Sequence, residues 1–389
     1  MKANFIVLFC LVVFSFSAQE IGTKNTNAVP ATQVEELQDS IVNTKYEKES
    51  TTKKSKAKKV SADDLEVPVN KLDQDQDTQI KAASFYSIKA NVASQSTQRS
   101  PSISQQQQLD NLVQEYKESN PNSFEYNYFS YLAGNHNVAL INNLLEAKKL
   151  KPNNVDVQVQ LAAYYFITKD QNNLVQSLEF LVKNKKIEQE LFTYAEHLLE
   201  SVEQNGTLIT HGFDDTYSVL YLQNVMKKRK DVTLISLDFL QSAFYKTELN
   251  KAKFVIPKTN IVDVNYFADF CNLNATKKLY VSMTLPKPYL EKVISNIQIS
   301  GISFAYNNSV ENLKETNAKF YKQFISSNTI NQYASDKCKK LSSNYLPLLY
   351  SLKKEYTEGK ELEKAKEVQA KIDRINVQSQ VTKSVSSYK

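Results

Sequence analysis

The sequence predicts a helix-rich α/β fold, in which helical hairpins flank a small, mostly parallel sheet. Two stretches carry this prediction. Residues 206–245 alternate between short apolar runs and one amphipathic stretch, which is the pattern of a strand–helix–strand unit. Residues 109–204 instead repeat apolar side chains at helical spacing, interrupted by short polar turns. Together the two stretches place paired helices ahead of a sheet.

The strand–helix–strand unit forms the centre of the predicted sheet. Its helix follows a polar loop, and Asp215 or Thr216 is expected to cap that helix, because either side chain can accept a hydrogen bond from a free backbone N–H group. A helical crossover brings the two flanking strands side by side in the same direction. The expected strands are 207–210, 232–240, 278–285 and 301–306.

The helices ahead of the sheet come in pairs, expected at 124–132 with 138–150 and at 155–167 with 173–183, before a single helix at 188–202. Their packing and turn positions are Tyr131, Ala147, Leu150, Pro152, Asn153 and Asn154 in the first copy, and Leu161, Ala162 and Tyr165 in the second. With this pattern the segment resembles tetratricopeptide repeats. Such pairs bury their apolar seam only by stacking on a neighbour, so we expect the sheet region to be that neighbour.

The chain beyond the first two strands is mainly helical. The distribution of apolar residues in this part of the chain predicts helices at 262–274, 289–297, 312–324, 333–357 and 361–375. Pro347 is expected to bend the fourth of these helices. Gly359 separates the last two, as in an antiparallel helix pair.

Composition sets the two ends of the chain apart. The first residues form the pattern of a secretory signal peptide, with Lys2, an apolar run at 5–16 and small residues up to Ala18. The alternative is an uncleaved membrane anchor, although the apolar run is short for crossing a bilayer. The polar residues that follow cannot bury enough surface to offset their ordering entropy. The predicted segments are a signal peptide at 1–18, a disordered linker at 19–108, helical repeats at 109–204, an α/β region at 205–310, C-terminal helices at 311–376 and a polar tail at 377–389.

Charge and cysteine content narrow the classes of function. The net charge of +6 is too small to indicate binding to nucleic acid. No CxxC motif or cluster of cysteine and histidine is present, so we expect no metal site and no cofactor. After signal cleavage the chain keeps Cys271 and Cys338, which either pair in an oxidising compartment or remain buried thiols. We expect export to the periplasm or cell envelope, with no transmembrane segment after cleavage.

Residues 206–245 and 278–375 carry a family resemblance. The matching residues are Gly212, Asp215, Thr216, Tyr217, Tyr221, Gln223, Asp231, Val232, Ser236, Leu237 and Leu240, then 280–284, 301–306 and the closing 358–361 with Lys364 and Ala365. This region resembles the soluble C-terminal region of a Bacteroidetes family of large membrane proteins of unknown function. That family is described as glycosyltransferase-like and akin to protein O-mannosyltransferases.

The chain departs from that family at the loop after the first strand and in its length. His211, Phe213 and Asp214 stand where the family has an asparagine, an acidic residue and an asparagine, and Ser218 replaces a proline. The multi-span membrane part, where glycosyl transfer would occur, is absent from this sequence. The resemblance therefore brings no catalytic residue, and we expect that the chain is not an enzyme.

One polar cluster lies where a ligand site is expected. His211, Asp214, Asp215 and Thr216 follow the end of a strand and precede a helix, which is where open α/β sheets place ligands. A helix N-terminus can hold an anion, and a histidine with two carboxylates can hold a metal or exchange protons. The alternative is purely structural, with Asp215 as the cap of the helix.

The leading hypothesis is an exported, non-catalytic interaction or scaffold protein of the bacterial cell envelope, which binds a protein partner through its helical repeats. Tyr126, Tyr128 and Tyr164 are the aromatic residues expected to be free for that partner, although such residues also form repeat cores. The alternatives are a small-ligand or glycan-binding α/β domain that uses the loop at 210–216, or an accessory subunit of an envelope glycosyltransferase system.

Overall fold

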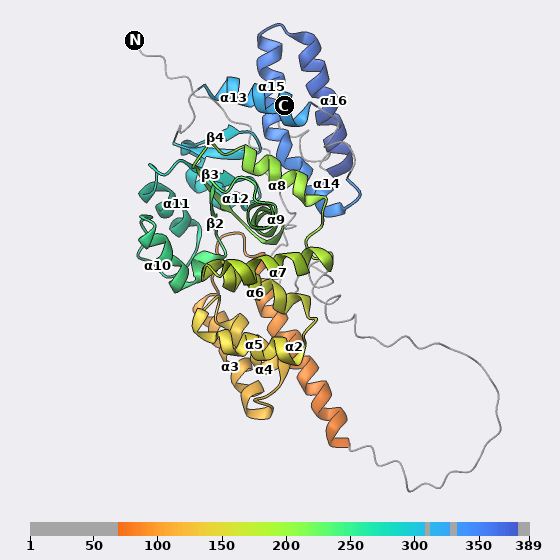
Figure 1. Cartoon of the computed structure of the whole chain (residues 1–389), viewed down its shortest axis with the longest axis vertical. Helices are drawn as coiled ribbons and strands as arrows, with labels where there is room; N and C mark the ends of the chain where they lie inside the picture. The colour runs from red at the N-terminus through yellow and green to blue at the C-terminus, as the bar shows by residue number, and fades with distance from the viewer. Residues whose placement is uncertain (1–68, 308–311, 327–332, 380–389) are drawn as a thin grey trace, which may run out of the picture.

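The computed structural model describes residues 69–307, 312–326 and 333–379 (Figure 1). The helices nearest the N-terminus lie at one end, the sheet lies in the middle, and the last helices lie at the other end. The expected signal peptide and most of the expected linker fall outside the described residues. No helix within the described ranges is long and apolar enough to cross a membrane.

Helix α2 (Val69–Ser94) corrects the expected linker at 19–108. Phe85 of α2 is fully buried and stacks on Phe129 with ring centroids 4.3 Å apart. Helix α3 (Ile103–Ser119) also starts inside the expected linker, where Ser102 and Gln105 form a capping box. The linker prediction failed here because α2 presents few apolar side chains, and these complete the core of neighbouring helices instead of forming a stripe of their own.

The paired helices lie where the sequence places them. The first pair is α4 (Phe124–Ala133) with α5 (Ile141–Leu150), the second is α6 (Val155–Ile167) with α7 (Gln171–Lys183), and α8 (Leu191–Glu200) follows. Side chains of Ser123, Asn154 and Asp170 cap the N-termini of α4, α6 and α7. Because these caps satisfy backbone N–H groups that the helix leaves free, they fix where each helix begins.

The sheet has five strands in the order β2-β1-β3-β5-β4. They are β1 (Thr207–Thr210), β2 (Thr233–Ser236), β3 (Leu279–Ser282), β4 (Ile297–Ser300) and β5 (Ser303–Tyr306). β1 pairs in parallel with β2 and β3, whereas β5 pairs antiparallel with β3 and β4. The α/β fold class is confirmed, and the sheet is mixed where the sequence predicted a mostly parallel one.

Strand β4 was not predicted, because the sequence placed a helix at 289–297 and the next strand at 301–306. The helix there, α12 (Lys287–Val293), ends earlier, and the chain turns back through Gly301 into β5. Only Ile297 and Ile299 alternate in β4, which is too short a pattern to separate a strand from a helix.

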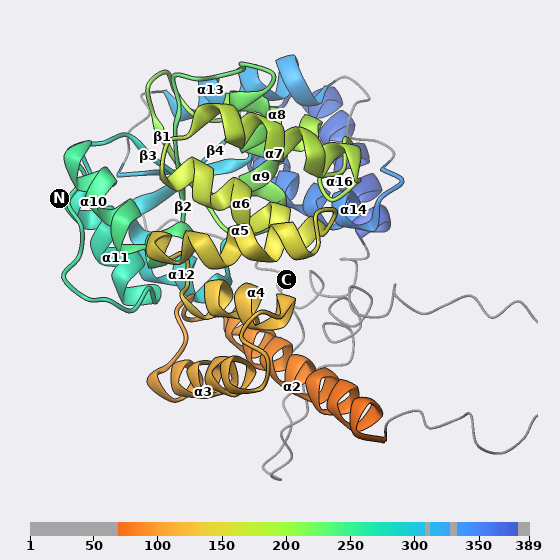
Figure 2. The same cartoon turned by 60° about the horizontal axis from the view of Figure 1, so that its bottom comes forward.

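Helical connections cover both faces of the sheet. Helix α9 (Phe213–Asn224) joins β1 to β2 on one side, and α10 (Ala243–Lys251) with α11 (Val264–Leu273) joins β2 to β3 on the other (Figures 1 and 2). α7 and α8 pack on α9, so the helices ahead of the sheet do supply a layer over it. β1 is therefore the central parallel strand, and its carboxyl end faces the loops after β2 and β3.

The last helices close the far end of the sheet. They are α13 (Leu313–Phe320), α14 (Asp336–Ser342), α15 (Leu346–Glu358) and α16 (Leu362–Ser379), with a π-helical turn at Tyr321–Ile325. Pro347 begins α15 and does not bend a longer helix, because proline is tolerated in a first turn. Cys271 and Cys338 are both buried and unpaired.

Candidate functional site

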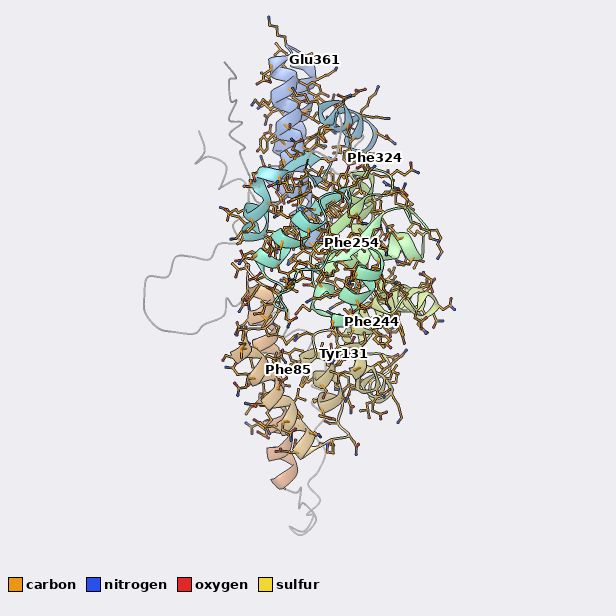
Figure 3. All side chains as sticks on the ribbon, turned by 90° about the vertical axis from the view of Figure 1, so that its left-hand side faces the viewer. Phe85, Tyr131, Phe244, Phe254, Phe324 and Glu361 are labelled. Atoms are coloured by element: carbon orange, nitrogen blue, oxygen red, sulfur yellow. The ribbon has the colours of Figure 1, made fainter. Side chains whose placement is uncertain are left out.

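A cavity of about 280 Å³ lies at the carboxyl ends of β1 and β2, between the sheet and helices α2, α4 and α6. Its lining residues are Lys89, Val92, Ala93, Arg99, Tyr131, Leu132, Asn135, His136, Val159, Gln160, Gly212, Phe213, Tyr217, Asp238, Phe239 and Gln241. Tyr131 lies at the junction of the helices with the sheet unit (Figure 3). The cavity is therefore lined by two separate parts of the chain.

An ion pair crosses the junction at the cavity wall. Arg99 Nε donates to Asp238 Oδ1 at 2.7 Å, and the two side chains are 11% and 22% exposed. Burial, the largest effect, raises the pKa of Asp238, but the charge and hydrogen bond of Arg99 together with the neighbouring His211 and His136 outweigh it and lower that pKa to about 2. Asp238 is thus held as an anion whose charge Arg99 already compensates.

Lys89 supplies a second cation, from α2. Its Nζ donates to the backbone oxygen of Leu132 and to Oδ1 of Asn135, each at 3.1 Å. Burial lowers the pKa of Lys89 to about 8, so the side chain is still mainly charged at neutral pH.

Two neutral histidines flank these charges. Burial lowers the pKa of His136 and of His211 to about 4. Lys89 adds to this shift at His136 and Arg99 adds to it at His211, whereas Asp238 opposes it at both. Nδ1 of His136 and Nε2 of His211 are buried and have no hydrogen-bond partner within the described part of the chain. The edge of His136 packs on Phe239 with ring centroids 5.3 Å apart. His136, which lines the cavity, therefore keeps one ring nitrogen available to a ligand.

The predicted helix cap is wrong. Helix α9 begins at Phe213, and its N-cap is Gly212, which has φ of 82° and provides no side chain for capping. Asp215 lies within the first turn, where its Oδ2 accepts from the His211 N–H at 3.1 Å and from the Thr284 hydroxyl at 2.6 Å. Glycine tolerates this left-handed backbone conformation, so the helix starts earlier than the sequence pattern suggested.

The four predicted loop residues do not converge on one site. The hydroxyl groups of Thr210 and Thr216 lie 2.9 Å apart in the core, and Asp215 binds across to the end of β3. Asp214 faces α14, where Lys337 Nζ approaches its Oδ1 at 3.5 Å. Of these residues, only His211 lies near the charged groups of the cavity, Arg99 and Asp238. Its neighbour Gly212 lines the cavity wall.

The aromatic residues expected to bind a partner divide into two kinds. Tyr128 is only 3% exposed and packs against Phe124 and Phe129, so it is part of the repeat core and offers no surface. Tyr126 and Tyr164 are half-buried. The prediction for Tyr128 failed because a helix buried on two sides gives most of its aromatic residues to packing.

Residues 191–384 match TMEM260-associated domain 2. This domain is linked to a glycosyltransferase-like family of the O-mannosyltransferase type, in agreement with the resemblance seen in the sequence. The match spans just under half of the 389 residues. Comparison with curated proteins and with solved structures finds no match.

The segment that matches TMEM260-associated domain 2 builds only one wall of the cavity. It supplies Gly212, Phe213, Tyr217, Asp238, Phe239 and Gln241, whereas all the other lining residues precede it. Among the described residues, no three histidine, cysteine, aspartate or glutamate side chains lie close enough together to hold a metal ion.

Sequence reasoning missed the main charges of the cavity. Lys89 and Arg99 fall in the stretch that was expected to be disordered, and Arg99 is 139 residues away from its partner Asp238. Asp238 could have been found, because it follows β2 directly and ligands in open α/β sheets bind at the carboxyl ends of strands.

Proposed function

We propose that this protein binds a small hydroxyl-rich ligand, a sugar or short glycan, in the cavity between its helices and its sheet. The position of the cavity carries the proposal. It lies at the carboxyl ends of β1 and β2, where open α/β sheets bind ligands, and helices from outside the sheet unit close it.

The cavity walls have the chemistry that sugar recognition needs. Gln160 and Gln241 carry amides, which both donate and accept hydrogen bonds, as sugar hydroxyl groups do. Phe213, which is partly exposed and stacks on Tyr217 with ring centroids 4.5 Å apart, adds an aromatic side chain against which the apolar side of a sugar ring can pack. Nδ1 of His136, which lines the cavity and has no described hydrogen-bond partner, extends this set of neutral polar groups.

We propose binding without a reaction at this cavity. A general acid or base needs a group that exchanges a proton near neutral pH. Arg99 holds Asp238, the carboxylate in the cavity lining, ionised. Lys89, whose pKa of about 8 lies nearest to neutral pH, already donates from Nζ to Leu132 and Asn135. The match to a glycosyltransferase-linked domain supports a carbohydrate ligand. We propose an exported protein that acts in the cell envelope beside such an enzyme. Its tetratricopeptide-like helices form part of the wall of the binding cavity.

Calorimetry on the full-length protein with a panel of monosaccharides tests this function. At least one sugar should bind with an affinity of about 1 mM or tighter, and Gln160→Ala and Gln241→Ala should each weaken it about 5- to 10-fold by removing one hydrogen bond. Asp214→Ala is the matched control, because Asp214 faces α14 and not the cavity.

Two results would overturn the proposal. One is that no sugar in the panel binds. The other is that sugar binding is lost in Asp214→Ala and kept in both glutamine variants, which would move the site to the loop at 210–216. Melting curves of each variant show whether a loss of binding reflects unfolding.

Binding of a protein partner is the second candidate function. Its specific support is that α5 exposes Leu145 and Leu150, at 42% and 43% of their surface. Apolar side chains at the surface of helical repeats commonly contact partners. A protein crosslinked reproducibly to α5 in the cell envelope, with no sugar bound by the purified chain, would favour this candidate.

A further inference from the structure

The charges in the cavity wall do not cancel. Arg99 and Asp238 form an ion pair, with Nε and Oδ1 at 2.7 Å. Lys89 bonds only to neutral oxygens, those of Leu132 and Asn135. The lining residues therefore carry two cations and one anion, which leaves one positive charge without a counter-ion.

Nearby carboxylates do not supply the missing negative charge. Asp238 is the carboxylate whose charge acts on Lys89, and Arg99 already pairs with it. Asp214 lies beside Lys337 at 3.5 Å, and Asp215 binds Thr284 on the β3 side of the loop. The N-terminus of α9 borders the cavity without a side-chain cap, so its helix dipole adds to the positive potential.

Both cations have hydrogen-bond donors to spare. An ammonium group has three N–H donors, and Lys89 uses two in its described contacts. Arg99 uses Nε on Asp238 and Nη1 on the Ala93 backbone oxygen, while Nη2 makes no hydrogen bond to any described residue. A buried cation without a counter-ion costs free energy, and burial accordingly lowers the pKa of Lys89 to about 8.

We infer that the ligand of this cavity is a sugar with one anionic group, a carboxylate or a phosphate, and that Lys89 selects it. This inference rests on the proposed function and narrows its ligand class. The anion accepts hydrogen bonds from Lys89 Nζ and Arg99 Nη2, while the amides and Phe213 hold the sugar ring. The cavity volume of about 280 Å³ suits a single sugar unit.

Calorimetry with glucose, glucuronate and glucose 6-phosphate tests the inference on the full-length protein. At low salt, at least one anionic sugar should bind about tenfold more tightly than glucose, because a hydrogen bond to a charged group is stronger than one to a neutral group. The carboxylate and the phosphate arms show which anion the cavity prefers. The advantage over glucose should shrink as salt is added.

Lys89→Gln is the decisive variant, since it removes the charge and keeps hydrogen-bond donors. It should reduce the preference for the anionic sugar about tenfold, to near equality with glucose. Lys81→Gln is the control on the same helix, where Lys81 pairs with Asp77 at 2.8 Å. Should Lys89→Gln fail to fold, Lys89→Arg must keep the preference, because it keeps the charge.

The outcomes separate this inference from the proposed function. Equal affinity for glucose and both anionic sugars overturns the inference and leaves sugar binding intact. A preference that survives in Lys89→Gln also overturns it, since another group must then hold the anion. Failure of all three sugars, and of the wider panel, overturns the inference and the proposed function together.

Discussion

Asp215 links two loops of the sheet at the scale of a single residue. Its carboxyl group is 1% exposed, and its Oδ2 accepts from the His211 backbone and from the Thr284 hydroxyl. Burial raises the pKa of this carboxyl group to about 7, and its hydrogen bonds oppose that shift only in part. Asp215 is therefore protonated in the folded protein at pH values where it is ionised in the unfolded chain.

The raised pKa of Asp215 predicts a loss of stability with rising pH. Its contribution is fully present below the unfolded pKa of 3.8 and is lost as the pH rises through about 7. Within that window, the free energy of unfolding should fall by up to about 1.4 kcal/mol per pH unit from this group. Asp215→Asn keeps an acceptor oxygen and cannot ionise, so it should remove this term.

Urea unfolding of wild type and Asp215→Asn at pH 5, 6, 7 and 8 measures the effect. The stability of the variant relative to wild type should increase with pH and level off above about pH 7. Taking the difference removes the opposite contributions of the buried histidines. A difference that stays constant over this range would show that Asp215 has the same protonation state in both forms.

The sequence located Asp215 correctly next to a helix N-terminus but missed its role. An acidic residue before an apolar helical run is the usual signature of a cap. Its hydroxyl partner, Thr284, lies 69 residues further along the chain, and no local pattern connects them. The same holds for Lys89, whose role at the cavity depends on helix packing.

Two glycines with positive φ make different demands at the scale of elements. Gly301, at φ of 56°, turns β4 into β5, and a Cβ there would lie 2.3 Å from Ser201 Oγ and 2.9 Å from Ser201 Cβ. Gly212, at φ of 82°, caps α9, and a Cβ there would meet nothing within 4 Å. The first position therefore needs both backbone freedom and space, and the second needs backbone freedom alone.

Alanine at these two positions should separate strain from steric overlap. Gly212→Ala should cost about 1–3 kcal/mol, from strain in a backbone region that essentially only glycine occupies. Gly301→Ala should cost about 2–4 kcal/mol, because overpacking against Ser201 adds to left-handed backbone strain. Urea denaturation of both variants measures the difference, and equal losses would show that the β4–β5 turn can move away from α8.

The elements that the sequence predicted are those with a clear period of their own. The helices from α4 to α8 and strands β1 to β3 have apolar patterns long enough to distinguish the helical repeat of about 3.6 residues from the strand repeat of two. α2 and β4 were missed because each owes its order to neighbours: α2 to the core around Phe129, and β4 to its pairing with β5. Tertiary packing of this kind overrides weak local signals.

Two hydrophobic cores organise the whole molecule. One surrounds Phe85, Phe129 and Tyr131 and holds α2 to α5 together. The other surrounds the sheet, and it includes Leu174, Leu178 and Leu181 of α7. The boundary between the cores thus falls within the helical repeats, ahead of α7, and not at residue 191 where the match to TMEM260-associated domain 2 begins.

This division predicts which fragments of the chain can fold. A fragment of residues 191–384 loses α6 and α7, and with them the three buried leucines of α7, which contribute roughly 5–9 kcal/mol. That loss is comparable to the whole stability of a typical domain, so this fragment should not unfold cooperatively. A fragment that starts at 153 keeps the Asn154 cap, α6 and α7, and should give a sharp urea transition by circular dichroism.

The longer fragment also tests where ligand binding resides. It lacks Lys89, Arg99, Tyr131 and His136, so it should fold but bind no sugar. Sugar binding by this folded fragment would place the site within the sheet unit alone. A cooperative transition in the 191–384 fragment would show that α9 does not need α7 to cover its apolar face, and that the matched domain is stable without the helices ahead of it.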